Sequence, residues 1–292
     1  MLRLLTLNVG SLFEEGWDRR RHEVVAWIDR VQPDVVCLQE AWESRDQPNT
    51  AGWVAEASEI HWHWAFGGFG IDFLAGDDPR FLFGSAVLSR WPIDDHRVHR
   101  LPTAPDPDDA MVAAMGWELL HARTAGLDVF TTHLAPAPAH GRHRRLQVLA
   151  IEQIIRAARG DRDALRFDRL REAMPAILCG DFNAEPDSDE MRFLRGLTVL
   201  DDRATFMQDA WSVAGDGGPG LTQDWQTHPL AASLNVHRKR IDHILVGDPF
   251  RRAGDAGRIL HCEVVADHPL TGIQASDHCG LIADIVWPAR PV

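Results

Sequence analysis

Apolar runs and an amphipathic stripe alternate along the first forty residues. Residues 2–8 (LRLLTLN) form an apolar run that ends at Asn8, and such a run predicts a buried strand. Residues 18–31 place apolar side chains at helical spacing, which predicts an amphipathic helix. Residues 34–40 (DVVCLQE) predict a second buried strand, ending at Glu40. The chain therefore begins as strand, helix, strand, and both strands finish on a polar side chain.

The same alternation continues to the end of the chain. A second helix is predicted at residues 143–160, where Leu and Ile form the stripe and Gly160 ends it. Loops rich in Gly, Pro and Asp are predicted at 103–110 and 215–220, and neither is long enough to separate domains. Strands are predicted at 84–93, 115–124, 127–134, 175–183, 239–247 and 279–287, with further candidates at 196–200 and 260–266. Many strands with few helices predict two packed sheets with helices outside, in one domain spanning residues 1–292.

Composition narrows the function classes. Hydrophobic residues make up 45% and charged residues 25% of the 292 residues, as in globular proteins. The net charge of −13 disfavours a passive nucleic-acid binder, which usually has a basic surface. A metal enzyme remains compatible, because a bound cation reverses the local charge. Four Cys fit no zinc pattern, and Cys37 and Cys179 lie in apolar runs that predict buried thiols.

The sequence indicates no membrane segment. The start, MLRLLTLNVG, lacks the length and the small-residue cleavage site of a signal peptide. No apolar run approaches the roughly 20 residues of a membrane span. We therefore expect a cytoplasmic protein, and nothing in the sequence indicates an oligomeric state.

Polar side chains recur where the predicted strands end. If these ends share one rim of the two sheets, carboxylates, amides and imidazoles converge there. The residues concerned are Asn8, Glu40, His133, Asp181, Asn183, Asp242, Asp277 and His278. Each of them alone has an ordinary explanation as a turn residue, a solvated group or a hydrogen-bonded core residue. The recurrence at strand after strand favours a common site.

A cluster of this kind is costly without a cation, because it would be strained or partly protonated. Two like charges 4 Å apart repel by roughly 1 to 4 kcal/mol, depending on the effective dielectric. Carboxylate and amide oxygens suit Mg²⁺ or Mn²⁺ and do not suit zinc. Such an ion polarises a phosphoryl oxygen, lowers the pKa of bound water and stabilises a leaving oxygen.

The stretch GDFN raises a specific question about Asp181. In an extended backbone Asp181 and Asn183 point to one side and Phe182 points into the core. The alternative is that these residues only turn the chain before Pro186.

Seven motifs in order resemble the endonuclease/exonuclease/phosphatase superfamily. The motifs span nearly the whole chain: TLNVG (6–10), LQE (38–40), GSAVLSRWPI (84–93), THL (132–134), GDFNAEP (180–186), RIDHILV (240–246) and SDH (276–278). The resemblance implies an α/β (α+β) fold, a four-layered α/β sandwich of two mostly antiparallel sheets flanked by helices. It also implies Mg²⁺-dependent hydrolysis of a phosphoester by in-line attack of water.

The resemblance also implies roles for individual residues. Glu40 is the principal metal ligand, with Asn8 and Asp277 beside it. Asp181 orients or deprotonates the attacking water, and Asn183 helps to hold the water and the phosphate. His278 contacts the scissile phosphate. His133 donates to the phosphate or leaving group, and Asp242 orients a histidine.

The sequence departs from the family pattern at Ser85, where Asn is frequent, and at His243, where an aromatic residue is frequent. The chain has no Tyr, which excludes the catalytic tyrosine of abasic-site endonucleases. Three functions stay open: a hydrolase of small-molecule or lipid phosphoesters, favoured by the acidic charge; a nuclease of DNA or RNA; and an inactive scaffold.

Two stretches could contribute to substrate binding. The aromatic residues 60–73 predict either a stacking or lipid-contacting loop or a core strand with a turn. Residues 140–146 (HGRHRRL) either reach a phosphate or begin a solvated helix. The arginines at 19–21 predict a solvated helix face.

Overall fold

The computed structural model describes residues 1–105, 112, 114–160, 170–224, 226, 238–248 and 250–291. Its first sheet contains β1 (Leu2–Asn8), β2 (Val35–Glu43), β3 (His63–Phe69), β4 (Leu82–Ser89), β11 (Ile259–Val265) and β12 (Gly280–Ile285), in the order β11-β12-β1-β2-β4-β3. Its second sheet contains β5 (Ile93–Arg100), β6 (Glu118–Thr124), β7 (Leu127–His133), β8 (Ile177–Asp181), β9 (Met207–Asp209) and β10 (Asp242–Gly247), in the order β5-β6-β7-β8-β10-β9.

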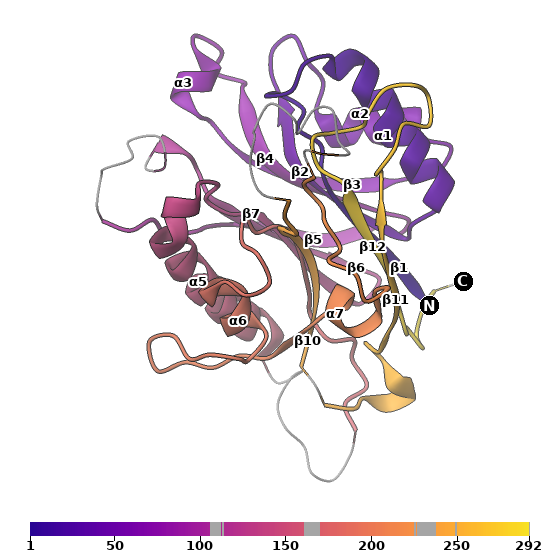
Figure 1. Cartoon of the computed structure of the whole chain (residues 1–292). Helices are drawn as coiled ribbons and strands as arrows, with labels where there is room; N and C mark the ends of the chain where they lie inside the picture. The colour runs from indigo at the N-terminus through magenta and orange to yellow at the C-terminus, as the bar shows by residue number, and fades with distance from the viewer. Residues whose placement is uncertain are drawn as a thin grey trace.

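Helices cover the outer faces of both sheets. The covering helices are α1 (Trp17–Val31), α2 (Thr50–Ala57), α5 (Gly141–Arg159) and α6 (Asp189–Leu194). The chain also forms the short helices α3 (Asp72–Ala75) and α7 (Ala210–Ala214) and 3₁₀ turns at Pro138–His140 and Ala253–Asp255. Ala210 and Trp211 of α7 belong to the buried cluster between the sheets. In Figure 1, α1 and α2 lie outside the first sheet, and α5 and α6 lie outside the second. The expected four-layered sandwich is confirmed.

Three apolar layers hold the sandwich together. Leu4 and Cys37 of the first sheet and Cys179 of the second belong to one buried cluster between the sheets. Ile28 of α1 packs in a cluster on the outer face of the first sheet. Val148 of α5 packs in the corresponding cluster outside the second sheet. The predicted burial of Cys37 and Cys179 is therefore confirmed, and all four Cys are free thiols.

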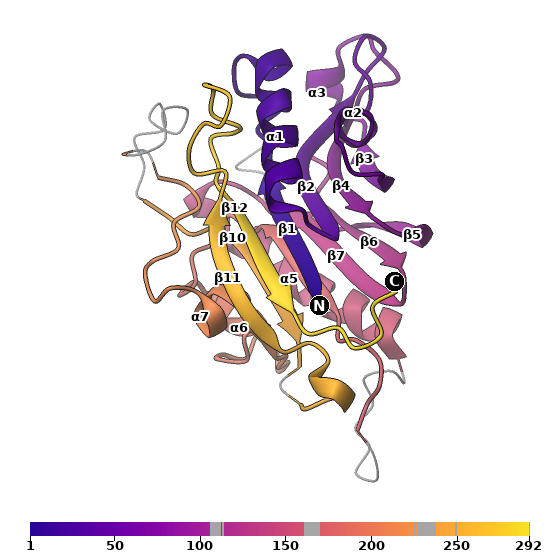
Figure 2. The same ribbon diagram turned by 90° about the vertical axis from the view of Figure 1, so that its right-hand side faces the viewer.

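The two sheets repeat one topology. Each has a central parallel pair, β1 with β2 and β7 with β8, and the remaining neighbours pair antiparallel. A helix, α1 or α5, connects the two strands of each parallel pair. Figure 2 shows β11, β12 and β1 side by side. This repeat is not detectable in the sequence, because the corresponding segments share topology without an obvious residue pattern.

Several expected boundaries are wrong. The stretch 84–93 is the end of β4 and the first residue of β5, because Pro92 interrupts the chain between them. Residues 196–200 are not a strand: only a bridge from Leu200 to Arg203 forms there. The candidate at 260–266 is confirmed as β11, and residues 215–220 are a loop. Residues 106–110 of the other predicted loop lie outside the described residues.

No helix in the described part of the chain combines the length and apolarity needed to cross a membrane. The aromatic segment 60–73 contributes β3 at an edge of the first sheet, so the expected strand forms. It is only partly a core strand, because Trp62 is buried and Trp64 is 43% exposed.

Candidate active site

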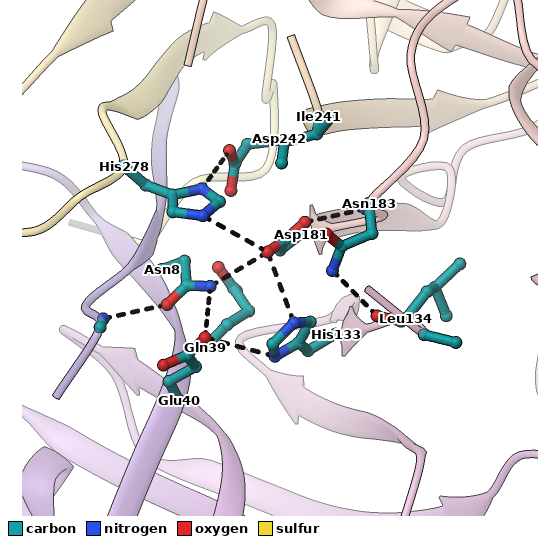
Figure 3. Close-up of polar contacts among 12 residues, drawn as sticks. Asn8, Gln39, Glu40, His133, Leu134, Asp181, Asn183, Ile241, Asp242 and His278 are labelled. Atoms are coloured by element: carbon teal, nitrogen blue, oxygen red, sulfur yellow. Dashed lines mark hydrogen bonds and ion pairs between the residues drawn. The ribbon is translucent and has the colours of Figure 1, made fainter. Parts of the chain in front are cut away.

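The carboxyl ends of the two parallel pairs meet at one rim of the sandwich. Parallel strands end at the same edge of a sheet, so their last side chains gather there. In the first sheet Asn8 is the last residue of β1, and Glu40 lies near the end of β2. In the second sheet His133 ends β7 and is paired with Asp181, which ends β8. Figure 3 shows these four side chains together.

Asp181 is the centre of this group. Its Oδ2 accepts a hydrogen bond of 3.0 Å from Nδ2 of Asn8. The same oxygen lies 3.5 Å from Nε2 of His133 and 3.8 Å from Nε2 of His278. Its side chain is buried, so these partners replace solvent around the carboxylate. One oxygen atom thus receives groups from both sheets (Figure 3).

A backbone irregularity directs Glu40 into the rim. The pairing of β2 with β4 shifts between Leu38 and Ala41, and Glu40 has a φ of 59°. Such bulges re-aim a side chain. Oε1 of Glu40 accepts a hydrogen bond of 3.0 Å from Asn8 Nδ2, so that amide bridges Glu40 and Asp181.

Burial, together with the charge of Asp277, raises the pKa of Glu40 to about 8. The carboxylates of Glu40 and Asp277 therefore lie close enough to repel each other, with too little positive charge nearby to compensate. This is the situation in which a bound cation restores the ionised form.

His278 and Asp242 form a pair on the other side of Asp181. Nδ1 of His278 donates to Oδ2 of Asp242 at 2.8 Å. Burial lowers the pKa of His278, but the charges of Asp242, Asp277 and Asp181 outweigh it and raise that pKa well above 6.5. Arg240, two residues before Asp242 in the chain, forms an ion pair of 2.9 Å with Asp209 and not with Asp242.

His133 has the opposite electrostatic character. Burial lowers its pKa, and the charge of Asp181 only partly opposes this effect. One histidine is therefore charged and the other neutral at neutral pH. When the pKa values of two neighbouring groups are pushed apart in this way, one group is the acid and the other stays neutral.

The backbone of Asn183 is not extended, so the expectation that Asp181 and Asn183 point together is wrong. Asn183 has a φ of 48°, and its backbone N–H donates to Oδ1 of Asp181 at 2.8 Å. Its Nδ2 donates to the carbonyl of Leu134 at 2.9 Å. Phe182 is buried, as expected. Asp181 therefore does both things: Oδ1 holds the turn, and Oδ2 faces the site.

Asp277 approaches the loop after β1. A Cβ atom on Gly10 would lie 2.8 Å from Oδ1 of Asp277, and Gly10 has a φ of 52°. Gly10 is therefore required by both its backbone conformation and its close approach to a carboxylate. Its N–H donates to Oδ1 of Asn8 at 3.0 Å, so the same loop orients the amide.

Arg20 corrects the expectation of a solvated arginine face at 19–21. It is fully buried, and its guanidinium donates to the carbonyls of Val9, Gly10 and Ala275 at 2.7 to 2.9 Å. It thereby joins the loop after β1 to the segment that carries Asp277. No signal in the local sequence marks this role, because Arg20 stands between Arg19 and Arg21 in a stretch typical of a solvated helix face.

Residues 140–146 do not begin a solvated helix at Arg144. That side chain is buried and forms an ion pair of 3.0 Å with Glu190 of α6. Sequence reasoning also missed Thr222, whose Oγ1 accepts from the N–H of Asp242 at 3.2 Å. Gln223 was missed as well: its Nε2 lies 3.5 Å from Nε2 of His278. No strand ending or motif marks either residue.

The side chains at the rim fit a divalent cation. Ligand atoms of Asp181, Asp242 and His278 all lie within 4.8 Å of one another. Oδ1 of Asp242 is buried and has no hydrogen-bond partner among the described residues. A donor set dominated by carboxylate oxygens suits Mg²⁺ or Mn²⁺.

Comparison with known proteins agrees with this fold. A sequence model of the Endonuclease/Exonuclease/phosphatase family matches residues 5–278. The chain therefore belongs to the endonuclease/exonuclease/phosphatase family. Comparison with curated protein sequences gives no match.

Solved structures share the whole fold at low sequence identity. An endonuclease/exonuclease/phosphatase family protein from Leptotrichia buccalis superposes with a TM-score of 0.66 at 17% identity, covering 98% of this chain and 100% of that one. TDP2 of D. rerio, in complex with a single-strand DNA product, gives 0.68 at 19% identity, with 97% of each chain covered. The human Nocturnin catalytic domain with bound sulfate gives 0.65 at 17% identity, covering 98% of this chain and 93% of that one. At these identities the likeness concerns the fold.

Proposed function

We propose that the chain is a metal-dependent hydrolase of phosphoester bonds. The three activities in the family name all cleave such bonds. The observation that carries the proposal is the convergence on Asp181 Oδ2 of Asn8, His133 and His278. A buried carboxylate among an amide and two imidazoles of different charge supplies an acceptor and donors within one small volume.

Glu40 and Asp277 would hold the divalent cation, with Asn8 beside them. The raised pKa of Glu40 supports this assignment, because a cation would remove the repulsion that Asp277 exerts on it. Asp181, Asp242 and His278 are the other possible ligand set. We favour the first set, because Nδ1 of His278 already donates to Asp242. When bound, Mg²⁺ or Mn²⁺ supplies charge stabilisation at phosphoryl oxygens and lowers the pKa of water.

The protein's own residues divide the proton transfers. Asp181 accepts a proton from the attacking water, whose oxygen forms the new bond to phosphorus as the ester P–O bond breaks. His278, held in its charged form by Asp242, donates from Nε2 to a phosphoryl oxygen. His133, as a neutral imidazole, donates a hydrogen bond to the phosphate or to the departing oxygen and keeps its proton, and the departing oxygen takes its proton from solvent. Asn183 contributes through its backbone N–H, which fixes Asp181.

For the substrate we propose a small-molecule or lipid phosphoester first, because the net charge of −13 opposes a polyanion. A nuclease is the second candidate. It is favoured by the shared fold with D. rerio TDP2, which was solved with a single-strand DNA product. An inactive scaffold is disfavoured, since all eight expected positions carry side chains that can do the chemistry.

The test is a hydrolysis panel with wild type and Asp181→Ala side by side. The panel contains bis-p-nitrophenyl phosphate, p-nitrophenyl phosphate, single- and double-stranded DNA, RNA, sphingomyelin and an inositol polyphosphate, each with Mg²⁺ and with EDTA. We expect at least one substrate to be turned over by wild type with Mg²⁺ only, and not by the folded variant. Equal activity of the variant, or activity unaffected by EDTA, would contradict the proposal. A nuclease would lose affinity steeply with added salt, whereas a small-ester hydrolase would not.

A further inference from the structure

A row of five polar residues crosses the second sheet at the level of the active site. Arg100 pairs with Glu118, Glu118 with His133, His133 with Asp181, and Asp181 with Asp242. Residues directly opposite each other on neighbouring strands point to the same face of a sheet. The row therefore faces the first sheet and runs from the proposed catalytic residues to the edge strand β5.

Arg100 ends this row in an exposed position. Its Cζ lies 4.3 Å from the centre of the Phe69 ring, at the end of β3 in the opposite sheet. Phe69 is held there because Gly116 leaves room: a Cβ on Gly116 would lie 2.4 Å from the ring. A cation over an aromatic face is attracted by the ring quadrupole, so the guanidinium has a preferred place at the rim.

Arg100 has no carboxylate partner within the part of the chain that the structure describes. Its neighbour in the row, Glu118, does not serve as one. Glu118 is buried, and its Oε1 accepts from the backbone N–H of Ser85. Gly84 and Gly67 leave space for that carboxyl group beside the first sheet, since Cβ atoms on them would lie 2.5 and 3.1 Å from its oxygens. The Arg100 charge is therefore available to a ligand.

We propose that Arg100, supported by Phe69, binds a second anionic group of the substrate. Neighbouring strands lie about 4.8 Å apart, which places Arg100 about 10 Å from His133 at the Cα level. A guanidinium binds phosphate with two parallel hydrogen bonds, so phosphate is the favoured group. The inference rests on the proposed function and deepens it: the substrate is a phosphoester that carries another phosphate. That phosphate belongs either to an adjoining nucleotide or to a multiply phosphorylated small molecule.

Equilibrium binding tests the proposal without requiring turnover. Calorimetry with Mg²⁺ present would compare two pairs of probes: thymidine 5′-monophosphate with thymidine 3′,5′-bisphosphate, and inositol 1-phosphate with inositol 1,4-bisphosphate. We expect wild type to bind the bisphosphate of one pair about tenfold more tightly than its monophosphate. Arg100→Gln should abolish that preference while leaving monophosphate binding within about twofold. The pair that shows the preference identifies the source of the second phosphate.

Arg97→Gln is the matched control. Arg97 lies on the same strand, its side chain is 71% exposed, and it pairs with Asp95. The Arg97→Gln variant should keep the wild-type preference. Successive residues of a strand face opposite sides of a sheet, and Arg97 and Arg100 are an odd number of residues apart, so Arg97 does not belong to the row. A wild type without preference in either pair, or a folded Arg100→Gln that keeps it, would overturn the subsite. If the preference is present but the hydrolysis panel shows no turnover, the proposed function fails and the Arg100 subsite stands.

Discussion

Nδ1 of His278 lies 2.8 Å from Oδ2 of Asp242, and this hydrogen bond joins the two sheets at the rim. Asp242 begins β10 of the second sheet, and His278 precedes β12 of the first. Burial raises the pKa of Asp242 to about 6, so it is ionised at neutral pH and favours the imidazolium form of His278. The pair therefore fixes both the orientation and the charge of the histidine.

Replacing Asp242 with Asn should keep the shape and remove the charge. The pKa of His278 should then fall, because burial lowers it and the nearest carboxylate no longer compensates. We expect hydrolysis at neutral pH to fall by at least about 100-fold, a size typical of a lost acid–base contribution. The measurements are kcat and an NMR titration of the histidines.

Asp284→Asn is a suitable control, since Asp284 pairs with Arg3 at the opposite end of β12. It should retain wild-type turnover. An Asp242→Asn variant with an unchanged His278 titration would show that Asp242 does not set that charge.

Gly10→Ala should weaken metal binding. Its Cβ would meet Asp277 Oδ1 at 2.8 Å and displace a proposed ligand. Loss of supporting geometry around a metal typically costs 10–100-fold in affinity, so we expect at least about a tenfold increase in the Kd for Mg²⁺ by calorimetry.

Gly126→Ala separates this effect from backbone strain. Gly126 has a φ of 80°, but nothing lies within 4 Å of its added Cβ. Both variants should lose about 1 kcal/mol of stability through the left-handed backbone, and only Gly10→Ala should lose Mg²⁺ affinity. Equal affinities in the two variants would argue against Asp277 as a ligand.

Arg20→Met should destabilise the protein by about 3 kcal/mol, because it leaves several buried carbonyls without a donor. These carbonyls, of Val9, Gly10 and Ala275, belong to the segments on either side of the site. Arg19→Met, on the exposed face of the same helix, should change stability by less than about 0.5 kcal/mol. Urea unfolding measures both, and similar losses would exclude a specific structural role for Arg20.

His243 should make stability depend on acid pH. Burial lowers its pKa to about 4, with Arg240 contributing. Between the unfolded value near 6.5 and this folded value, the unfolded chain binds a proton that the native protein does not. Stability therefore falls as pH drops through that window, by about 2 kcal/mol from pH 7 to pH 5.

His243→Gln provides the comparison for this effect. Its free energy of unfolding should change less between pH 7 and pH 5 than that of wild type, by about the same 2 kcal/mol. Identical pH profiles for the two proteins would mean that folding does not lower the pKa of His243.

The sequence is sufficient for the layers and for the position of several candidate residues at the rim, for a physical reason. Apolar runs such as 34–40 must be buried, and a polar residue at the end of a buried strand must lie at a rim, so Glu40 and Asp181 are placed there by the sequence alone. Short elements such as β9 and α3 escape prediction because three or four residues carry too little periodicity. That residues 1–292 form one domain stays a prediction.

Contacts between distant segments cannot be read from the pattern. Arg20 stands between two other arginines in the sequence, and its guanidinium is held by the carbonyls of Val9, Gly10 and Ala275, the last of them 255 residues away. The direction of Asn183 is not predictable from strand alternation, because the chain turns there with a positive φ. The row from Arg100 to Asp242 depends on strand register, which no single segment encodes.

The sharpest test of a metal-dependent hydrolytic centre is the recovery of activity after metal removal. Wild type and Glu40→Gln would be treated with EDTA, and the hydrolysis rate on each substrate of the panel would be measured as Mg²⁺ is returned. We predict that Mg²⁺ restores wild-type turnover of at least one substrate and that Glu40→Gln remains at least about 100-fold slower at the same Mg²⁺ concentration. Full activity without metal, no turnover of any substrate, or an identical Mg²⁺ response in Glu40→Gln would contradict a metal-dependent centre at this rim.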